Sequence, residues 1–172
     1  MNSEFQLTDL FALSGTLYLV AVSFRLSIID IREHRLPNRI VLPAYPITIT
    51  GQLLASALGN NWLNLISSVG CASLAFVVGL VANRWASLGM GDVKLMGAIA
   101  LSLGWFSFLA PLISVVLAFI IACAVVLVMV ALRKTTMGSS FALGPYLLVG
   151  LVLTQMLTWS TYFGGFSPNF LM

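Results

Sequence analysis

The sequence predicts an all-α membrane protein, a bundle of six transmembrane helices that forms one domain over residues 1–172. Of its 172 residues, 60% are hydrophobic and only 8% are charged, and the mean hydropathy is +1.05. An ordinary soluble domain carries about 25% charged residues. The 5 acids and 8 bases of this chain cannot cover a surface in water. Its apolar blocks also lack the alternating ten-residue pattern of a membrane β-barrel. These observations exclude a soluble enzyme.

Each apolar block is long enough to be a membrane-crossing helix, which needs about 20 residues to span roughly 30 Å of hydrocarbon. Polar connections at residues 30–39, 83–92 and 133–140 alternate with uncharged connections at 59–61 and 104–111. The six blocks between and beside these connections cover residues 10–29, 40–58, 62–82, 93–109, 112–132 and 141–163.

The fourth block allows two interpretations. If the chain turns near Gly104, about a dozen residues separate Asp92 from the turn. The helix is then about 18 Å long, too short for a full span, and Asp92 lies at membrane depth. If the helix continues to Leu109 and Pro111 opens the next one, Asp92 lies at the membrane interface instead. The sequence alone leaves both open.

The basic residues predict the orientation of the bundle. The net charge of +3 comes from bases that are dispersed between apolar blocks, which does not indicate a nucleic-acid partner. By the positive-inside rule the first, third and fifth connections are cytoplasmic, so both termini lie outside and membrane lipid is the main partner. All eight bases lie at these three connections or at the adjoining helix ends: Arg25, Arg32, Arg35, Arg39, Arg84, Lys94, Arg133 and Lys134.

Acidic residues are costly in such a chain, so each one needs a reason. Glu4 and Asp9 lie at the entry to the first helix, where negative charge suits the helix dipole. Asp30, Glu33 and Asp92 lie on the predicted cytoplasmic side. Asp30 follows the inner end of the first helix directly, and it could simply be an interface residue paired with an arginine. Glu33 fits an ordinary loop acid, with contact to a basic substrate segment as the alternative.

Asp92 ends the string Gly89-Met90-Gly91-Asp92. Two residues without a Cβ let another backbone approach closely, or they allow an extended stretch of the kind that a bound peptide needs. The alternative is structural, because an Asp just before an apolar block commonly caps a helix by accepting bonds from its first N–H groups.

Two carboxylates brought together can hydrolyse a peptide bond without a cofactor. Like charges a few ångströms apart cannot both ionise, so the pair shares one proton and can activate a water while protonating the substrate. The sequence contains no HExxH and no GxSxG, which leaves a zinc protease or a serine nucleophile without support. A metal site around His34, the single histidine, is disfavoured because a lone loop histidine is usually solvated. We therefore expect neither a metal nor another cofactor.

Three segments resemble the signatures of the type IV prepilin peptidases. Residues 30–38, DIREHRLPN, resemble the first active-site signature of that family. Residues 89–95, GMGDVKL, resemble its GxGDxK signature, and residues 142–147, ALGPYL, resemble the GP motif of its last helix. GxGD alone is a weak signal, but all three motifs in this order across six helices make a strong one. The resemblance covers about residues 10–163.

The resemblance implies an intramembrane aspartyl endopeptidase that removes the short basic leader of prepilins or pseudopilins. The site then lies at the cytoplasmic face of the inner membrane, and prepilin or pseudopilin is the partner. Residue by residue, Asp30 and Asp92 correspond to the catalytic pair. The supporting or substrate-binding positions are Gly89, Gly91, Lys94, Pro37, Asn38, Gly144 and Pro145.

The chain also departs from the larger members of that family. Those members carry an N-terminal cytoplasmic extension with paired CxxC motifs and methylate the new N-terminus, whereas here the first helix begins by about residue 10. We expect no methyltransferase activity. Asn38 stands where larger members often have the Asp of an LPD sequence. In this respect the chain resembles the short, peptidase-only members of tight-adherence (Flp) pilus systems. A small ion-coupled carrier and a non-catalytic scaffold of a pilus or secretion assembly remain the alternatives.

Overall fold

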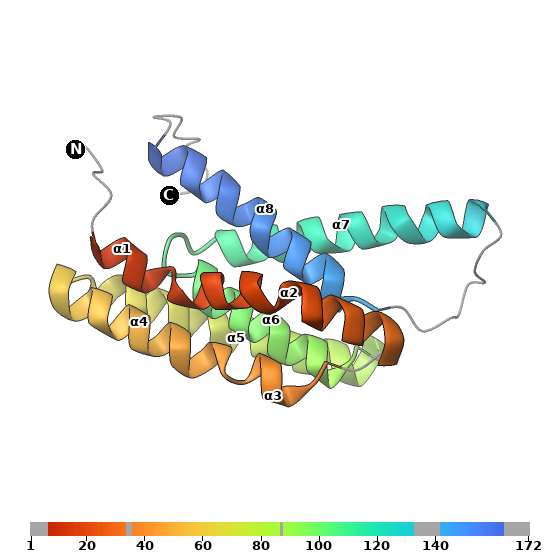
Figure 1. Ribbon diagram of the computed structural model, residues 1–172, viewed down its shortest axis with the longest axis horizontal. Coiled ribbons are helices and arrows are strands. Elements are labelled where there is room, and N and C mark those ends of the chain that lie inside the picture. The colour runs from red at the N-terminus through yellow and green to blue at the C-terminus, as the bar shows by residue number, and fades with distance from the viewer. Residues whose placement is uncertain (1–6, 34–35, 87, 133–141, 164–172) are drawn as a thin grey trace.

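The protein consists of helices joined by short connections in the part of the chain that the computed structural model describes, residues 7–33, 36–86, 88–132 and 142–163 (Figure 1). No strand occurs among these residues, which confirms the all-α class. The helices in chain order are α1 (Leu7–Ala12), α2 (Ser14–Glu33), α3 (Asn38–Val41), α4 (Ala44–Gly59), α5 (Trp62–Ala86), α6 (Met90–Leu103), α7 (Ala110–Ala131) and α8 (Gly144–Phe163).

Four helical segments are long and apolar enough to cross a membrane. They are Ser14–Glu33, Asn38–Gly59, Trp62–Trp85 and Ala110–Ala131, the second of which joins α3 and α4. They support a membrane protein, as the composition predicted. Six spans with both termini outside stay a prediction, and the bases Arg35, Arg133 and Lys134 lie outside the described residues.

Two predicted helices are interrupted near their starts. The first block is divided into α1 and α2 at Leu13, and the second into α3 and α4 by a turn at Leu42 and Pro43. Proline has no backbone N–H to donate inside a helix, which favours a boundary there. Between α4 and α5 the chain reverses at Asn60, which adopts a left-handed conformation with φ 54° that asparagine tolerates better than most residues.

The fourth block turns at Gly104, as the first of the two interpretations has it. Helix α6 ends at Leu103, and Gly104 closes it by donating its backbone N–H to the carbonyl oxygen of Ala100. Pro111 stands in the first turn of α7, so it belongs to the next helix. With 14 residues α6 is about 21 Å long, shorter than the roughly 30 Å hydrocarbon core of a bilayer.

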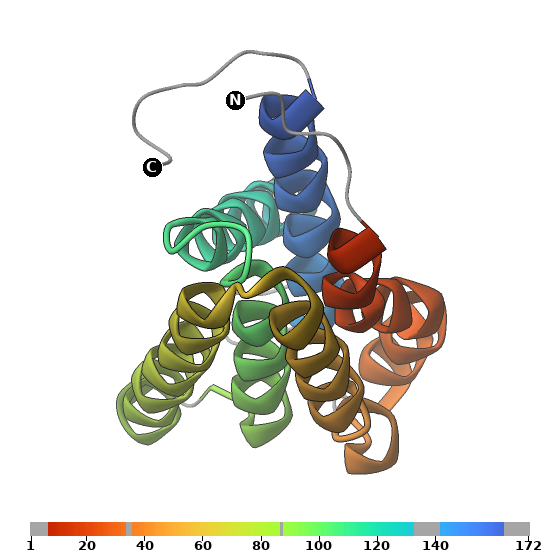
Figure 2. The same ribbon diagram turned by 90° about the vertical axis from the view of Figure 1, so that its left-hand side faces the viewer.

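Helix α6 is the central element of the bundle. Figure 2 shows it between α4 and α5, with α7 and α8 on its other side. A helix that is apolar all round is typically a buried one, and from Leu95 to Leu103 every residue of α6 is buried. The first turn of this buried helix carries Asp92, so the packing of α6 fixes where that carboxyl group lies.

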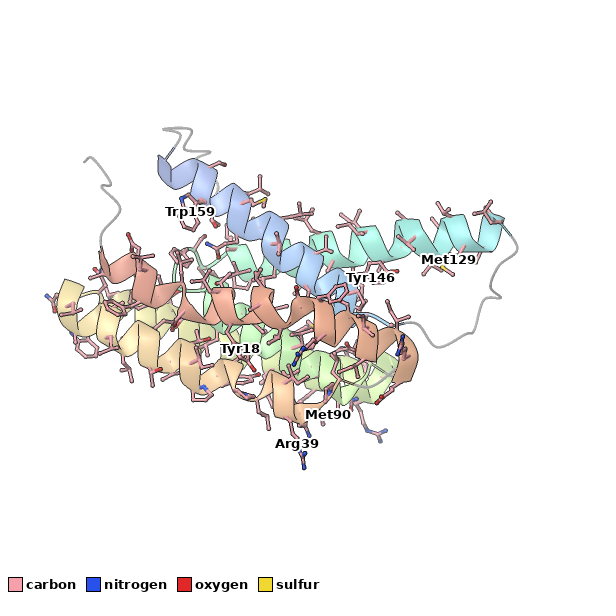
Figure 3. The ribbon with its side chains drawn as sticks, viewed as in Figure 1. Tyr18, Arg39, Met90, Met129, Tyr146 and Trp159 are labelled. Carbon is pink, nitrogen blue, oxygen red and sulfur yellow. The ribbon has the colours of Figure 1, made fainter. Side chains whose placement is uncertain are left out.

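Polar side chains tie the neighbouring helices to α6 and to one another. Buried Gln52 on α4 donates from Nε2 to the carbonyl oxygen of Leu101 at 2.8 Å, and Ser68 on α5 donates to Gln52 Oε1 at 2.7 Å. Tyr18 on α2, labelled in Figure 3, donates to the carbonyl oxygen of Ile40 at 2.9 Å, while Arg39 on α3 extends away from the bundle. These bonds fix α4 against the end of α6 and α3 against α2.

Candidate active site

Asp30 lies in the last turn of α2 and is 4% exposed. Its Oδ2 accepts a hydrogen bond of 2.9 Å from the backbone N–H of Gly144, the first residue of α8. A Cβ added to Gly144 would lie 2.7 Å from the same oxygen, closer than real Cβ atoms come. Glycine at this position therefore lets the start of α8 approach the Asp30 carboxyl group closely enough to bond to it.

Asp92 lies in the first turn of α6, two residues inside the helix. The N-cap position belongs to Gly89, whose φ of −61° and ψ of 136° are extended. The structural alternative for Asp92 as an N-cap residue is therefore wrong: the helix begins earlier than the apolar pattern indicates. Oδ1 of Asp92 is buried and accepts no hydrogen bond from the described residues.

The two glycines of this string act in different ways. The extended conformation expected there is limited to Gly89, because Met90 and Gly91 are already helical. Gly91 lies against Leu36, and a Cβ added to it would be 2.8 Å from the Leu36 Cβ. Leu36 also packs against Gly144, where an added Cβ would be 3.3 Å from Leu36 Cδ2. The chain between α2 and α3 thus inserts a buried leucine between the starts of α6 and α8.

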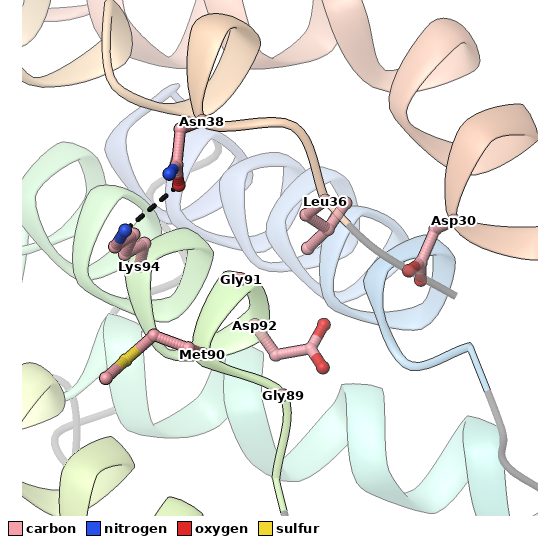
Figure 4. A pocket seen from close by; sticks show the side chains of 8 residues that line it. All are labelled: Asp30, Leu36, Asn38, Gly89, Met90, Gly91, Asp92 and Lys94. Carbon is pink, nitrogen blue, oxygen red and sulfur yellow. Dashed lines mark hydrogen bonds between the residues drawn. The ribbon is translucent and has the colours of Figure 1, made fainter. Parts of the chain in front are cut away.

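Both carboxyl groups open into one cavity of about 440 Å³. Figure 4 shows the Asp30 and Asp92 side chains turned towards the same space, one from the end of α2 and the other from the start of α6. The residues that line the cavity are Asp30, Leu36, Asn38, Gly89, Met90, Gly91, Asp92 and Lys94.

Lys94 completes one side of this cavity. Its Nζ donates to Oδ1 of Asn38 at 3.0 Å, a contact that joins α6 to the start of α3 (Figure 4). Tyr45 on α4 donates from its hydroxyl to the backbone oxygen of Lys94 at 2.7 Å. The first turns of α6 are thus held from α3 and α4 on one side, opposite the side from which Asp30 approaches.

Most of the predicted site residues meet at this cavity. Gly144 does not line the cavity, but its backbone N–H donates to Asp30, which does. Pro37 and Pro145 are not among the lining residues either. Pro37 instead caps α3, where its extended backbone starts the helix, and Pro145 is the second residue of α8. Both prolines therefore act on the backbone next to a site residue rather than on the cavity itself.

Two lining residues, Leu36 and Met90, did not stand out in the sequence. They are apolar, and nothing in a hydrophobic sequence marks one leucine or methionine from another. Their signal is position, since Leu36 precedes Pro37 and Met90 stands between the two glycines.

The site holds two acids and one base from the described residues. Among those residues no group of three or more His, Cys, Asp and Glu side chains lies together. His34 lies outside the described residues. The cavity offers the chemistry of two carboxyl groups that face one space, with a lysine at its side.

Comparison with known proteins identifies the family of this chain. The model of the type IV leader peptidase family matches residues 17–130, more than half of the chain. The matched part contains Asp30, Asp92 and the glycine string, and it ends before Gly144. No curated protein and no solved structure matches. Because the match spans the helices that carry both carboxyl groups, the chain belongs to the type IV leader peptidase family.

Proposed function

We propose that this protein is an intramembrane aspartyl endopeptidase that removes the short basic leader from prepilins or pseudopilins. The family supports a peptidase of this general kind. The single observation that carries the specific proposal is that Asp30 and Asp92, 62 positions apart in the sequence, line one cavity with their carboxyl groups turned to the same space. We assign these two residues as the catalytic pair.

The reaction follows from the chemistry of such a pair. Two neighbouring carboxyl groups hold one proton between them, since both cannot carry charge at close range. The ionised group takes a proton from a water molecule, whose oxygen attacks the carbonyl carbon of the scissile peptide bond. The protonated group supplies a proton to the substrate, and the C–N bond then breaks with the amine leaving in protonated form. This cycle needs no metal and no cofactor.

The remaining site residues have supporting roles in this proposal. Gly89, Gly91 and Gly144 leave room for the carboxyl groups and for Leu36, while Lys94 and Asn38 form the cavity wall opposite Asp30. Pro37 and Pro145 set the starts of α3 and α8. The positive-inside pattern of the sequence supports placing this end of the bundle at the cytoplasmic face of the inner membrane in this proposal, where a leader peptide would be presented.

The proposal is tested by co-expressing the chain with a candidate prepilin and reading the mature N-terminus by mass spectrometry. We expect Asp30→Asn and Asp92→Asn each to abolish processing while the protein still inserts into the membrane at normal abundance. Glu33→Gln is the matched control, because Glu33 is an exposed acid in the same turn of α2 and does not line the cavity. The Glu33→Gln protein should process the prepilin as the wild type does.

The same experiment separates the alternatives. Continued processing by the inserted Asn variants would show that the pair is not catalytic. The chain acts as a scaffold if the wild-type protein processes no prepilin and pilus assembly nevertheless requires its presence. In that case the Asp30→Asn and Asp92→Asn variants would support assembly as well as the wild type does. Ion flux in proteoliposomes that depends on Asp30 and Asp92 without cleavage would favour a carrier. The mass of the mature N-terminus also reports methylation, and we expect none.

A further inference from the structure

The Leu36 side chain contacts the starts of two helices of the candidate site. Leu36 lies in the connection between α2 and α3, and only 9% of its surface is exposed. A Cβ added to Gly91 on α6 would lie 2.8 Å from the Leu36 Cβ and 3.3 Å from its backbone nitrogen. A Cβ added to Gly144 on α8 would lie 3.3 Å from Leu36 Cδ2. Leu36 therefore fills the space between these two helix starts.

Each of these glycines adjoins one carboxyl group of the candidate pair. Gly91 directly precedes Asp92 in α6, and Gly144 donates its backbone N–H to Asp30 Oδ2 at 2.9 Å. The Cβ added to Gly144 would meet Asp30 Oδ2 and Leu36 Cδ2 together, at 2.7 and 3.3 Å. The position of Asp30 relative to Asp92 thus depends on how far apart Leu36 holds the starts of α6 and α8.

The backbone next to Leu36 is anchored to α6 through the start of α3. Leu36 precedes Pro37, and a proline ring disfavours the helical conformation in the residue before it. Pro37 is the N-cap residue of α3, and its carbonyl oxygen accepts the backbone N–H of Ile40 at 3.0 Å. Asn38 Oδ1 accepts a hydrogen bond of 3.0 Å from Lys94 Nζ on α6. The leucine is therefore held at a fixed place beside α6.

The apolar character of Leu36 suits a spacer beside two carboxyl groups. Figure 4 shows its side chain next to the space that Asp30 and Asp92 face. Leucine neither donates nor accepts a hydrogen bond, so it does not compete for a proton that the pair shares. Leu36 belongs to one buried apolar core with Leu95 of α6 and Leu147 of α8. Close-packed interiors transmit strain, so a change in volume at Leu36 is felt at both helix starts.

We propose that Leu36 is a positioning residue, which sets the separation of the Asp30 and Asp92 carboxyl groups by holding the starts of α6 and α8 apart. This inference rests on the proposed endopeptidase function and adds to it a residue outside the acid pair on which the rate of bond breaking depends. Leu36 transfers no proton. Its effect belongs to the chemical step, because a shift of about 1 Å in a reacting group costs about a hundredfold in rate.

The first test shortens the Leu36 side chain and measures kcat and KM separately for prepilin cleavage by purified protein. We expect Leu36→Ala to lower kcat on the order of a hundredfold and to leave KM within about twofold, because spacing acts on the transition state. Leu36→Met nearly conserves the volume and should keep kcat within about threefold of the wild type. Leu36→Val removes one methylene group and should lower kcat about tenfold, which keeps the test available if Leu36→Ala does not accumulate. Unchanged kcat in the shortened variants would overturn the inference.

Leu19→Ala is the matched control, because Leu19 is a fully buried leucine of the same core that does not line the cavity. A large-to-small change there destabilises the fold. The melting temperature in detergent should therefore fall at least as far as for Leu36→Ala, while kcat stays within about twofold of the wild type. An equal loss of kcat in both variants would show a general structural effect and overturn the positioning role. A change confined to KM in Leu36→Ala would indicate contact with the substrate and would also overturn it.

A double-mutant cycle with Gly144→Ala gives a readout that a general loss of stability would not produce. Both changes act on the spacing between Asp30 and the start of α6, so their effects should not multiply. We expect the variant with both Leu36→Ala and Gly144→Ala to lose about a hundredfold in kcat, whereas independent effects would give about ten-thousandfold. Multiplied effects would overturn the inference and leave the endopeptidase in place. Continued processing by the Asp30→Asn and Asp92→Asn proteins would instead count against the proposed function itself.

Discussion

At the residue scale, the contact between Gly144 and Asp30 is the most specific feature of the candidate site. The two residues are 114 positions apart, yet the backbone N–H of one donates to the carboxyl group of the other at 2.9 Å. The contact orients Asp30 and places the positive end of α8 beside a carboxylate, which electrostatics favours. Its geometry leaves no room for a side chain on Gly144.

We therefore predict that Gly144→Ala lowers the processing rate by on the order of a hundredfold, because a shift of about 1 Å in a reacting group has that cost. The added methyl group would lie 2.7 Å from Asp30 Oδ2, so either the carboxyl group or the start of α8 must move. The measurement is the rate of prepilin cleavage by equal amounts of purified protein.

Gly70→Ala is the matched control for this substitution. Gly70 lies within α5 with nothing within 4 Å of an added Cβ, so the change tests glycine-to-alanine replacement without a contact. Its cleavage rate should equal that of the wild type. A Gly144→Ala protein with unimpaired cleavage would mean that Asp30 does not need the position that this bond gives it.

At the element scale, the short helix α6 depends on polar bonds from its neighbours. The last carbonyl groups of a helix lack hydrogen-bond donors inside the helix. Gln52 on α4 provides such a donor to the carbonyl oxygen of Leu101 near the end of α6. Ser68 then bonds to Gln52 from α5, so three helices meet at one buried amide. When a buried polar group loses its hydrogen-bond partner, the loss of stability exceeds the net contribution of an ordinary hydrogen bond, because the group stays desolvated without compensation.

We predict that Gln52→Leu destabilises the protein by about 1–3 kcal/mol, because it leaves the Leu101 carbonyl oxygen unpaired in the interior. The measurement is unfolding in detergent, followed by the loss of helical circular dichroism. Ser56→Ala is the control, since the side chain of Ser56 bonds within its own helix to the backbone oxygen of Gln52. Equal stability of both variants would show that the amide does not hold α6.

At the scale of the whole molecule, the two ends of the bundle differ in what they carry. Helix α4 runs from the active-site end, near Lys94 and Arg39, to the turn at Asn60. Four segments have the length and apolarity of spans, whereas the apolar blocks of the sequence predict six spans. The distribution of bases predicts that the active-site end lies inside.

We predict that cysteines placed at the two ends of the bundle differ in accessibility. In intact cells, a membrane-impermeant thiol reagent should label Asn61→Cys and should not label Arg39→Cys or Arg84→Cys until the membrane is permeabilised. The background is a protein in which Cys71 and Cys123 are replaced. Labelling of Arg39→Cys in intact cells would reverse the orientation and place the candidate site outside.

How much of this protein could be predicted from its sequence depends on the range of the forces involved. The helical class and the lipid environment follow from composition, because apolar blocks without charges leave the backbone no partner except itself. The five acids stood out because a carboxyl group is rare and expensive in such a chain. The resemblance of the surrounding motifs to the prepilin peptidases then pointed to Asp30 and Asp92 among them. These features are decided locally and need no knowledge of packing.

The tertiary structure decided the rest, because it depends on which distant surfaces fit together. Only packing shows that α6 ends at Leu103, that its N-cap residue is Gly89 and not Asp92, and that Leu36 lies between the starts of α6 and α8. The bond from Gly144 to Asp30 arises in the same way. Local sequence patterns show which solvent surrounds the chain and where helices form. A site made of four chain segments exists only once those segments have packed together.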